Sequence, residues 1–372
     1  MYAITGIGIL DSLGENLQSN YEKLLNRDYG TSYSIDKVEG HPKVDPTVHM
    51  ALKTSSQAVE QSGWNTNEYT DVAVISSGIF SGGHNFVRSL EAHKDGKRAS
   101  IKQLLTTGQN FISTNISEQN KFIGPSFFIT SSCTAGLSAL EVGIMHIDRG
   151  YDKVLVNSVD AMSEVWMNGW NKWYFNSIGA WTSDGNVKPF DIDRTGIKIG
   201  DASVSMALEP LDKAIERNAS ILAVIEQVES AVDSDHPTQP SKEARGTKTM
   251  MDKIKNMSVD YVNAHATGTP VGDIVEYSNM QRYYPEGTPM TSFKGAIGHC
   301  MGASGLVELA YTVETMNRNV IAPSPYLDKP LGRYFDFVID EPLEKPINRA
   351  MKNSFGFGGR CATVVLRKDK DV

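Results

Sequence analysis

Short apolar runs rich in β-branched residues alternate along the chain with segments in which apolar positions recur at helical spacing. A continuous apolar run between turn residues is typical of a strand that is covered on both faces. Strands are predicted at Tyr2–Ile9, Asp71–Ser76, Phe127–Thr130, Lys153–Val159, Ala202–Leu208, Ile221–Glu229, Val259–Asn263, Met290–Phe293, Phe335–Ile339, Met351–Phe355 and Cys361–Leu366. Because these strands alternate with helical segments, the pattern predicts an α/β fold with covered sheets.

One predicted helix has clear signals at both ends. Asp45 is a suitable N-cap residue, and Pro46 occupies the first helical position, where its missing N–H removes no hydrogen bond. The apolar residues that follow share one face, and Gly63 ends the segment. By contrast, Val232–Gly246 is polar and contains proline, so we expect a surface loop there.

Two segments share one design and indicate an internal repeat. Ser131–Ile147 and Gly298–Val313 each begin with small or polar residues and continue as an apolar helix rich in small side chains. Small residues allow close backbone approach, so both helices are expected to be central and buried. The sequence therefore predicts two halves, residues 1–207 and 208–372, packed as one unit with a boundary near Ala207–Arg217.

Composition argues against several classes of protein. The 372 residues are 40% hydrophobic, which allows a large core, and the net charge of −8 comes without a basic stripe, so we expect no nucleic-acid binding. The densest basic run, His93–Arg98, is expected to be a solvated loop. No apolar run is long enough for a spanning helix, and the N-terminal residues lack a signal-peptide pattern.

The cysteine content points to a reducing compartment. The chain has only three cysteines, which are Cys133, Cys300 and Cys361. A low and odd number argues against a disulfide framework, so we expect a cytoplasmic protein. No cluster of Cys or His residues has zinc-site spacing, and we predict no metal.

Cys133 is the first candidate for chemistry. It follows the predicted strand Phe127–Thr130 and is expected at the first turn of a helix, where free N–H groups and the helix dipole stabilise a thiolate. On its own it could equally be a buried small hydrophobic residue. Other segments must decide between the two interpretations.

Three more candidates lie in the second half. His265, in "NAHATGTPVGD", follows the strand Val259–Asn263 in a loop, although a capped turn would also explain it. Lys294 and His299 lie in "TSFKGAIGHCMGASG", and His299 is expected to open the second buried helix. Lys294 could be an ordinary surface lysine, but its small and apolar surroundings favour a buried carboxylate partner, for which Glu308 is the candidate.

The segment "NSFGFGGRCA" is predicted to be a strand, a glycine turn and a second strand. Its turn could supply backbone N–H groups to an oxyanion, or could be a simple hairpin. It is not a phosphate loop, because the Walker spacing is absent. One cysteine, two histidines, a lysine and a donor turn in one chain together indicate a thiol acyl-transfer site.

These segments resemble the β-ketoacyl-acyl carrier protein synthases, the elongating condensing enzymes of fatty-acid and polyketide synthesis. The resemblance extends from "ITGIGILDSLG" through the cysteine segment and "KPFDIDRTGIKIGD" to "NAHATGTPVGD", "FKGAIGHCMGASG" and "NSFGFGG". It implies a thiolase fold, in which two βαβαβαββ halves stack as five αβαβα layers, and a dimer.

The resemblance also implies roles for the candidate residues. Cys133 would be the nucleophile that takes an acyl chain from the phosphopantetheine arm of an acyl carrier protein. His265 and His299 would assist decarboxylation of malonyl-carrier protein, and Lys294 would orient and support a histidine. The backbone N–H groups of Cys133 and Phe357 would form an oxyanion hole, with Phe357 also gating the acyl pocket.

Thr267 and Thr269 would touch the pantetheine arm, and no bound cofactor or metal is implied. The partners would be the acyl carrier protein and either a second copy of the chain or a ketosynthase-like subunit. The chain departs from the common family pattern at Ala266, Asp201 and Arg360–Cys361, and it is short. These departures indicate a divergent member, of a fatty-acid or a specialised polyketide or polyene pathway.

Alternatives stay open at this point. A thiolase-like acyltransferase shares the fold, but would place a second catalytic cysteine at the glycine turn, whereas Cys361 falls after it. A chain-length subunit of a heterodimer would lack the nucleophile, which Cys133 supplies. The sequence leaves open the acyl chain length and type, the choice between homodimer and heterodimer, and the carrier-protein docking surface.

Overall fold

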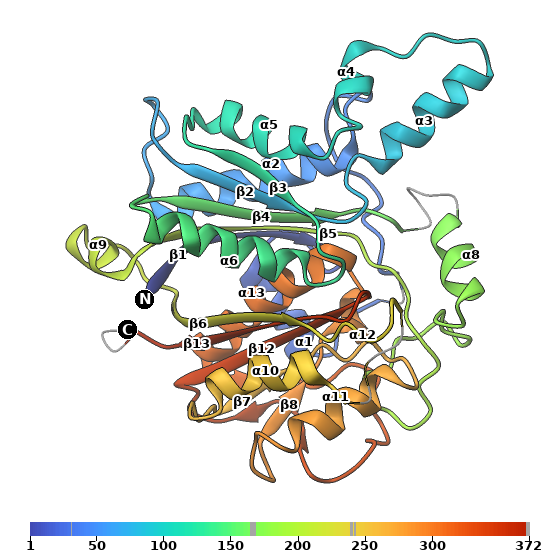
Figure 1. Cartoon of the computed structure of the whole chain (residues 1–372), viewed down its shortest axis with the longest axis vertical. Coiled ribbons are helices and arrows are strands. Elements are labelled where there is room, and N and C mark those ends of the chain that lie inside the picture. The colour runs from blue at the N-terminus through green and yellow to red at the C-terminus, as the bar shows by residue number, and fades with distance from the viewer. Residues whose placement is uncertain (31, 164–168, 239–240, 242, 370–372) are drawn as a thin grey trace.

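Three layers of helices enclose two layers of sheet (Figure 1). A computed structural model describes residues 1–30, 32–163, 169–238, 241 and 243–369. The strands of the first half are β1 (Tyr2–Asp11), β2 (Ala73–Ser77), β3 (Ser126–Ile129), β4 (Val154–Asp160) and β5 (Ala202–Pro210). Those of the second half are β6 (Ala223–Val232), β7 (Tyr261–Asn263), β8 (Pro289–Thr291), β12 (Arg349–Gly356) and β13 (Arg360–Arg367).

The strand order is the same in both halves. The hydrogen-bonded order is β10-β8-β7-β12-β13-β6-β1-β5-β4-β2-β3, so each half follows the sequence third, second, fourth, fifth, first strand, and β10 (Asp336–Phe337) is added at one edge. Only Tyr2–Ile4 of β1 pairs with β6, and the two halves of the sheet separate beyond that point. This repeat confirms the predicted thiolase fold of two βαβαβαββ halves.

Helices fill the space between the sheets and cover their outer faces (Figure 1). The central layer contains α6 (Ala135–Asp148) and α13 (Ser304–Arg318), which are the two small-residue helices of the predicted repeat. The outer layers contain α2 (Pro46–Ser62) and α5 (Asn110–Asn120) on one side, and α10 (Arg245–Ile254) and α11 (Gly272–Met280) on the other. Both halves therefore bury a helix of their own against the other half.

Shorter elements connect this frame. They are α1 (Leu17–Leu25), α3 (Gly83–Lys94), α4 (Ile101–Leu105), α8 (Trp170–Ser177), α9 (Leu211–Glu216), α12 (Lys294–Ile297), the 3₁₀ helix η1 (Met301–Ala303), β9 (Val320–Ile321) and β11 (Leu343–Glu344). Strand β5 continues past residue 207 to Pro210, and α9 follows. The chain thus passes from the first repeat to the second between the end of β5 at Pro210 and the start of β6 at Ala223.

The predicted strands and the capped helix agree with the structure, with two corrections. All eleven predicted strands are present with shifted ends, and the short β9 and β11 were not predicted. Asp45 caps α2 by accepting from the Thr47 N–H, and Gly63 ends it in a left-handed conformation with φ 70°. His299 does not open the second buried helix, because η1 intervenes and α13 begins only at Ser304.

Close backbone contact joins β1 to α2. A Cβ atom on Gly6 would lie 2.0 Å from the carbonyl oxygen of Ala58, and one on Gly8 would lie 2.0 Å from that of Thr54. Only glycine allows the strand to approach the helix this closely. These two glycines in "TGIGIL" therefore set the distance between the first sheet and its outer helix layer.

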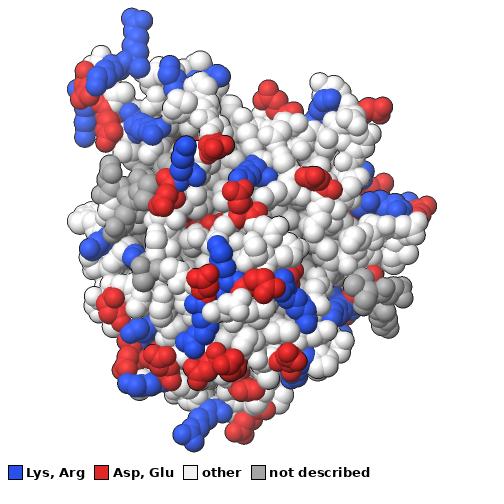
Figure 2. Space-filling view, turned by 180° about the vertical axis from the view of Figure 1, so that it is seen from behind, with Lys and Arg blue, Asp and Glu red and all other residues white. Residues whose placement is uncertain are grey.

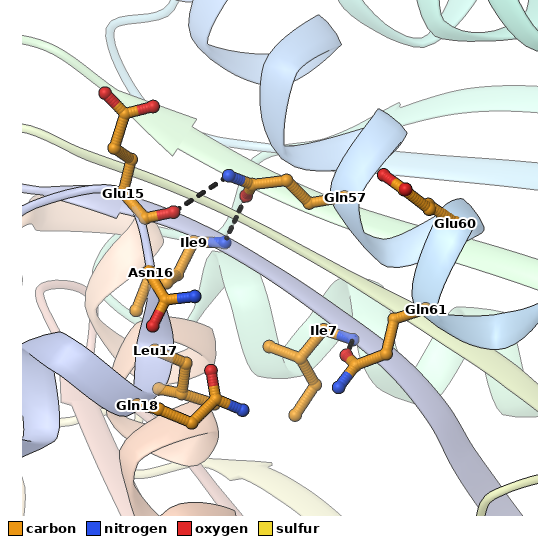
Figure 3. A pocket seen from close by; sticks show the side chains of 9 residues that line it. All are labelled: Ile7, Ile9, Glu15, Asn16, Leu17, Gln18, Gln57, Glu60 and Gln61. Carbon is orange, nitrogen blue, oxygen red and sulfur yellow. Dashed lines mark hydrogen bonds between the residues drawn. The ribbon is translucent and has the colours of Figure 1, made fainter.

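Side chains of α2 accept hydrogen bonds from the backbone N–H groups of β1 at residues that no longer pair with β6 (Figure 3). The side-chain oxygen of Gln61 accepts from the Ile7 N–H at 2.8 Å, and that of Gln57 accepts from the Ile9 N–H at 3.0 Å. The hollow beside them has a cavity volume of ≈270 Å³, and the predicted catalytic residues are not among those that line it. The two glutamine side chains thus bind the free backbone N–H groups of β1, and the hollow is separate from the candidate site.

The surface mixes charges of both signs. Figure 2 shows Lys and Arg side chains interspersed with Asp and Glu over one face of the molecule. His93–Arg98 is exposed at and beyond the end of α3. In the described ranges no helix is long and apolar enough to cross a membrane. The predicted loop Val232–Gly246 begins at the last residue of β6 and ends in the first turn of α10, and its other described residues connect the two.

Candidate active site

Cys133 lies in the turn between β3 and α6. Ser132, just before it, has φ 56°, a left-handed conformation that is strained for a residue other than glycine. The Ser354 hydroxyl on β12 donates to the Cys133 carbonyl oxygen at 3.0 Å, and the Thr134 hydroxyl donates to the Ser131 carbonyl oxygen at 2.7 Å. The two halves of the protein therefore jointly fix the position of the thiol.

The thiol of Cys133 is protonated at neutral pH. Burial raises its pKa to about 11, although the Ser132 hydroxyl, the charge of Lys294 and the Phe357 N–H act in the opposite direction. The expectation of a stabilised thiolate at the start of the helix is therefore wrong for the free protein. Loss of hydration outweighs these three contributions, because the side chain is almost fully buried.

The two predicted histidines face each other. The ring centroids of His265 and His299 are 5.5 Å apart and the planes meet at 82°. Burial lowers the pKa of both imidazoles well below its usual value, and the positive charges of Lys294 and Lys352 lower it further. Both rings are therefore neutral at physiological pH, and each can donate one hydrogen bond without bringing a charge.

The hydrogen bonds of His299 assign its proton. Its Nδ1 accepts from the Met301 N–H at 3.2 Å and lies 2.8 Å from the Ser304 hydroxyl. Because a backbone N–H can only donate, Nδ1 carries no proton, and we assign the proton to Nε2. His299 thus presents a fixed Nε2–H donor. Within the described ranges, the buried Nδ1 of His265 has no hydrogen-bond partner, so a bound group could pair with it.

Two carboxylates that the sequence interpretation missed hold the loop of His265. Glu276 accepts from the N–H groups of His265 and Ala266 at 2.8 and 2.7 Å, one on each oxygen. Asp273 accepts from the Thr267 N–H at 3.0 Å. The signal was present in "VGDIVEY", because acidic residues three apart on a helix share one face. The predicted pair Thr267 and Thr269 lies in the same loop, with hydroxyl oxygens 3.0 Å apart.

Lys294 is buried and pairs with the predicted partner Glu308. Its Nζ lies 2.5 Å from Oε1 of Glu308, and neither side chain is exposed. A second buried lysine, Lys352 on β12, pairs with the other oxygen of Glu308. The sequence analysis did not identify Lys352, which directly precedes the segment "NSFGFGGRCA". Its signal was a single charge in the stretch "AMKNSFG", which follows Arg349 at the start of the strand.

The glycine turn packs against the cysteine. The N–H of Phe357 lowers the pKa of the Cys133 thiol, and a Cβ on Gly356 would lie 3.0 Å from the Cys133 nitrogen. The Phe357 side chain is 37% exposed, whereas the ring that contacts His265 belongs to Phe355, with centroids 6.0 Å apart. The structure therefore gathers the predicted thiol, histidines, lysine and donor turn at one place.

The positions that depart from the common family pattern have different surroundings. Asp201 is buried and accepts from the N–H groups of Ser163 and Ile35 at 2.8 and 3.2 Å. Arg360 is exposed, and Cys361 is buried in the core. Across the described ranges, no group of three or more His, Cys, Asp or Glu side chains could hold a metal ion.

Comparison of the sequence finds relatives along almost its whole length. Models of the N-terminal and C-terminal domains of β-ketoacyl synthase match residues 34–214 and 222–328. The chain is 28% identical to 3-oxoacyl-[acyl-carrier-protein] synthase 2 of Coxiella burnetii and to that of Vibrio cholerae, with 98% of each chain covered. It is 32% identical to the mitochondrial 3-oxoacyl-[acyl-carrier-protein] synthase of Arabidopsis thaliana over 69% of this chain and 59% of the relative.

Solved structures share the fold. The ishigamide ketosynthase/chain length factor matches with a TM-score of 0.88 and 22% identity, over 99% of both chains. A type II polyketide ketosynthase, in complex with its acyl-carrier protein and bound to the hexaketide, matches with a TM-score of 0.86 and 18% identity, again over 99% of both chains. With the matched domains and the relatives, these findings show that the chain belongs to the β-ketoacyl synthase family of acyl-transferring condensing enzymes.

Proposed function

We propose that this protein condenses an acyl thioester held on Cys133 with the malonyl group of malonyl-acyl carrier protein, with loss of CO2. The observation that carries the proposal is the pair of neutral, buried imidazoles next to Phe355, at the turn that packs against the buried Cys133. Neutral N–H donors in a site that excludes water suit a reaction that develops negative charge on a thioester oxygen.

The first half-reaction transfers the acyl group. Sγ of Cys133 attacks the acyl thioester carbon, a carbon–sulfur bond to Cys133 forms, and the bond to the pantetheine sulfur breaks. The thiol proton ends on the released pantetheine thiol. The negative oxygen of the intermediate is stabilised by the N–H groups of Cys133 and Phe357, a role supported by the packing of the turn against the cysteine.

The second half-reaction forms the carbon–carbon bond. The malonyl carboxylate leaves as CO2, and its electron pair becomes an enolate whose oxygen accepts hydrogen bonds from His265 and His299. The enolate carbon then attacks the acyl carbon on Cys133, and the sulfur leaves with the bonding electrons and takes up a proton from solvent. Lys294 supports the histidines through its charge, which acts on both imidazoles and on the thiol.

The acyl and malonyl groups would arrive on the phosphopantetheine arm of a carrier protein, as part of the substrate. Thr267 and Thr269 are our candidates for contact with that arm, since they extend the loop beyond His265. A carrier-protein complex of a ketosynthase with this fold supports the partner. The pathway, fatty-acid or polyketide, and a cytoplasmic setting stay predictions.

Two other functions receive less support. A chain-length subunit needs no nucleophile, whereas Cys133 is held in a strained turn by both halves of the chain. A thiolase needs a second cysteine at the glycine turn. Here Cys361 is buried on β13, where its thiol donates to the Ala231 carbonyl oxygen at 3.2 Å.

Mass spectrometry after incubation with acyl-carrier protein tests the nucleophile. We expect one acyl adduct on the wild-type chain and none on Cys133→Ala. Cys361→Ala serves as the matched control, because it removes a buried thiol outside the site, and it should still acquire the adduct. An adduct that persists in Cys133→Ala would contradict the proposal.

A further inference from the structure

Lys352 is a buried charge to which the proposed reaction gives no role. Its side chain is fully buried, as are those of Lys294 and Glu308, and Glu276 is 4% exposed. Moving an ammonium group from water into a protein interior is costly unless the group is paired and hydrogen-bonded. A lysine retained at this position therefore needs a structural or chemical reason.

The contacts of Lys352 link it to the loop of His265. Its Nζ donates to the carbonyl oxygen of Ala264 at 3.0 Å, and Ala264 directly precedes His265. The same Nζ pairs with Oε2 of Glu308, whose Oε1 takes Lys294. The ammonium of Lys352 thus ties the chain just before His265 to the charged pair on the central helix α13.

The four buried charges cancel. Glu308 lies between two ammonium groups, and Glu276 accepts backbone N–H bonds on both of its oxygens. These contacts favour the ionised form of both carboxylates, and they oppose the burial that raises the pKa of Glu276. Two cations therefore face two anions around the histidine pair. If Lys352 lost its proton, one buried negative charge would be left uncompensated beside the enolate that the proposed reaction forms, and this would raise the barrier.

We propose that Lys352 is a positioning residue, whose ammonium group fixes the backbone before His265 and keeps the surrounding buried charges neutral in sum during decarboxylation. This inference rests on the proposed function. The titratable groups that face Lys352 come from α11, α12, α13 and the histidine loops, and are Glu276, Lys294, Glu308, His265 and His299.

The proposal has a consequence for pH. Burial lowers the pKa of Lys352 to about 8, with Lys294 acting in the same direction and Glu308 against it. Below about pH 8 the ammonium form is present, and above it the neutral amine can still donate a hydrogen bond but cannot cancel a charge. The rate of CO2 release should therefore fall as the pH rises through about 8.

The first experiment compares wild-type protein with Lys352→Met, which keeps the length of the side chain and removes the charge. CO2 release from malonyl-carrier protein is measured from about pH 6.5 to 9.5. We expect Lys352→Met to be slower by about tenfold at pH 7, less than the loss of roughly 10²–10³-fold for a direct oxyanion donor. Its profile should lack the decline near pH 8, and Lys248→Met, at an exposed lysine of α10, should match the wild type.

A second variant keeps the proposal falsifiable if Lys352→Met does not fold. Lys352→Ala is assayed with and without n-propylammonium, which supplies the missing ammonium group, and we expect a partial recovery of the rate. The inference is overturned by a flat wild-type profile up to about pH 9.5, or by Lys352 variants with an unchanged rate and profile. Failure of the proposed function looks different, because the wild-type protein would then release no CO2 at any pH.

Discussion

Cys133, His265 and His299 are buried together, and burial moves their pKa values in opposite directions. The pKa of the thiol is raised to about 11, and the pKa of each imidazole is lowered well below its usual value. For each group burial favours the neutral form. The resting site therefore holds no ionised nucleophile and no charged acid. At these three groups charge appears only during the reaction, whereas the buried ion pairs of Lys294 and Lys352 with Glu308 are charged throughout.

The histidines give the prediction at this scale. The pKa of both imidazoles is lowered, so both rings should stay neutral at about pH 6, where an ordinary histidine is largely protonated. Their ¹⁵N resonances should therefore keep the pattern of a neutral ring, and His299 should show a protonated Nε2. NMR of ¹⁵N-histidine protein from about pH 5 to 8 measures this, with assignment through His265→Ala and His299→Ala. Exposed His93 provides a reference resonance from outside the site. Titration of His265 or His299 near pH 6.5 would refute the assignment.

The functional groups of the site come from the ends of several elements that meet at one end of the central layer. The turn before α6 presents the thiol, the loop after β7 presents His265, the segment before η1 presents His299, and the β12–β13 turn presents N–H donors. Helix α11 holds the His265 loop through the carboxylates of Glu276 and Asp273. Each functional group thus stands at the end of an element that is fixed by packing elsewhere.

The contact of β1 with α2 gives the prediction at the element scale. In Gly8→Ala a methyl group would meet the Thr54 carbonyl oxygen at 2.0 Å, so strand and helix must move apart. Overpacking of this kind lowers the free energy of unfolding by about 1–3 kcal/mol. Urea denaturation followed by circular dichroism measures the loss. Gly83→Ala, where a Cβ meets no atom within 4 Å, is the control, and equal stability of the two variants would contradict the packing argument.

The sequence predicted the elements better than the contacts between them. Runs of apolar residues located the strands, and Asp45, Pro46 and Gly63 located α2, because these signals are local. Lys352, Glu276 and Asp273 were missed because their importance comes from burial and from partners far along the chain. The charge state of Cys133 was predicted wrongly for the same reason, since a helix start is visible in a sequence but loss of hydration is not.

At the scale of the whole molecule, the edge of the sheet bears on assembly. Strand β3 ends the hydrogen-bonded order, so its outer edge offers N–H and C=O groups to another strand. Phe127 on β3 is 46% exposed and nearby Ile123 is 65% exposed. An apolar edge strand of this kind favours pairing with a second chain, either another copy or a ketosynthase-like subunit.

The last prediction tests that edge with a single charge. We expect the purified protein to have about twice the chain mass of 40.8 kDa, and Phe127→Lys to shift it to the mass of one chain, because a lysine on an edge strand opposes pairing. Light scattering after size-exclusion chromatography measures both. Ile215→Lys on α9 replaces an equally apolar residue that is 53% exposed, and should leave the mass unchanged. If Phe127→Lys kept the wild-type mass, β3 would not be the assembly edge. Loss of assembly by both variants would instead indicate general destabilisation by a surface lysine.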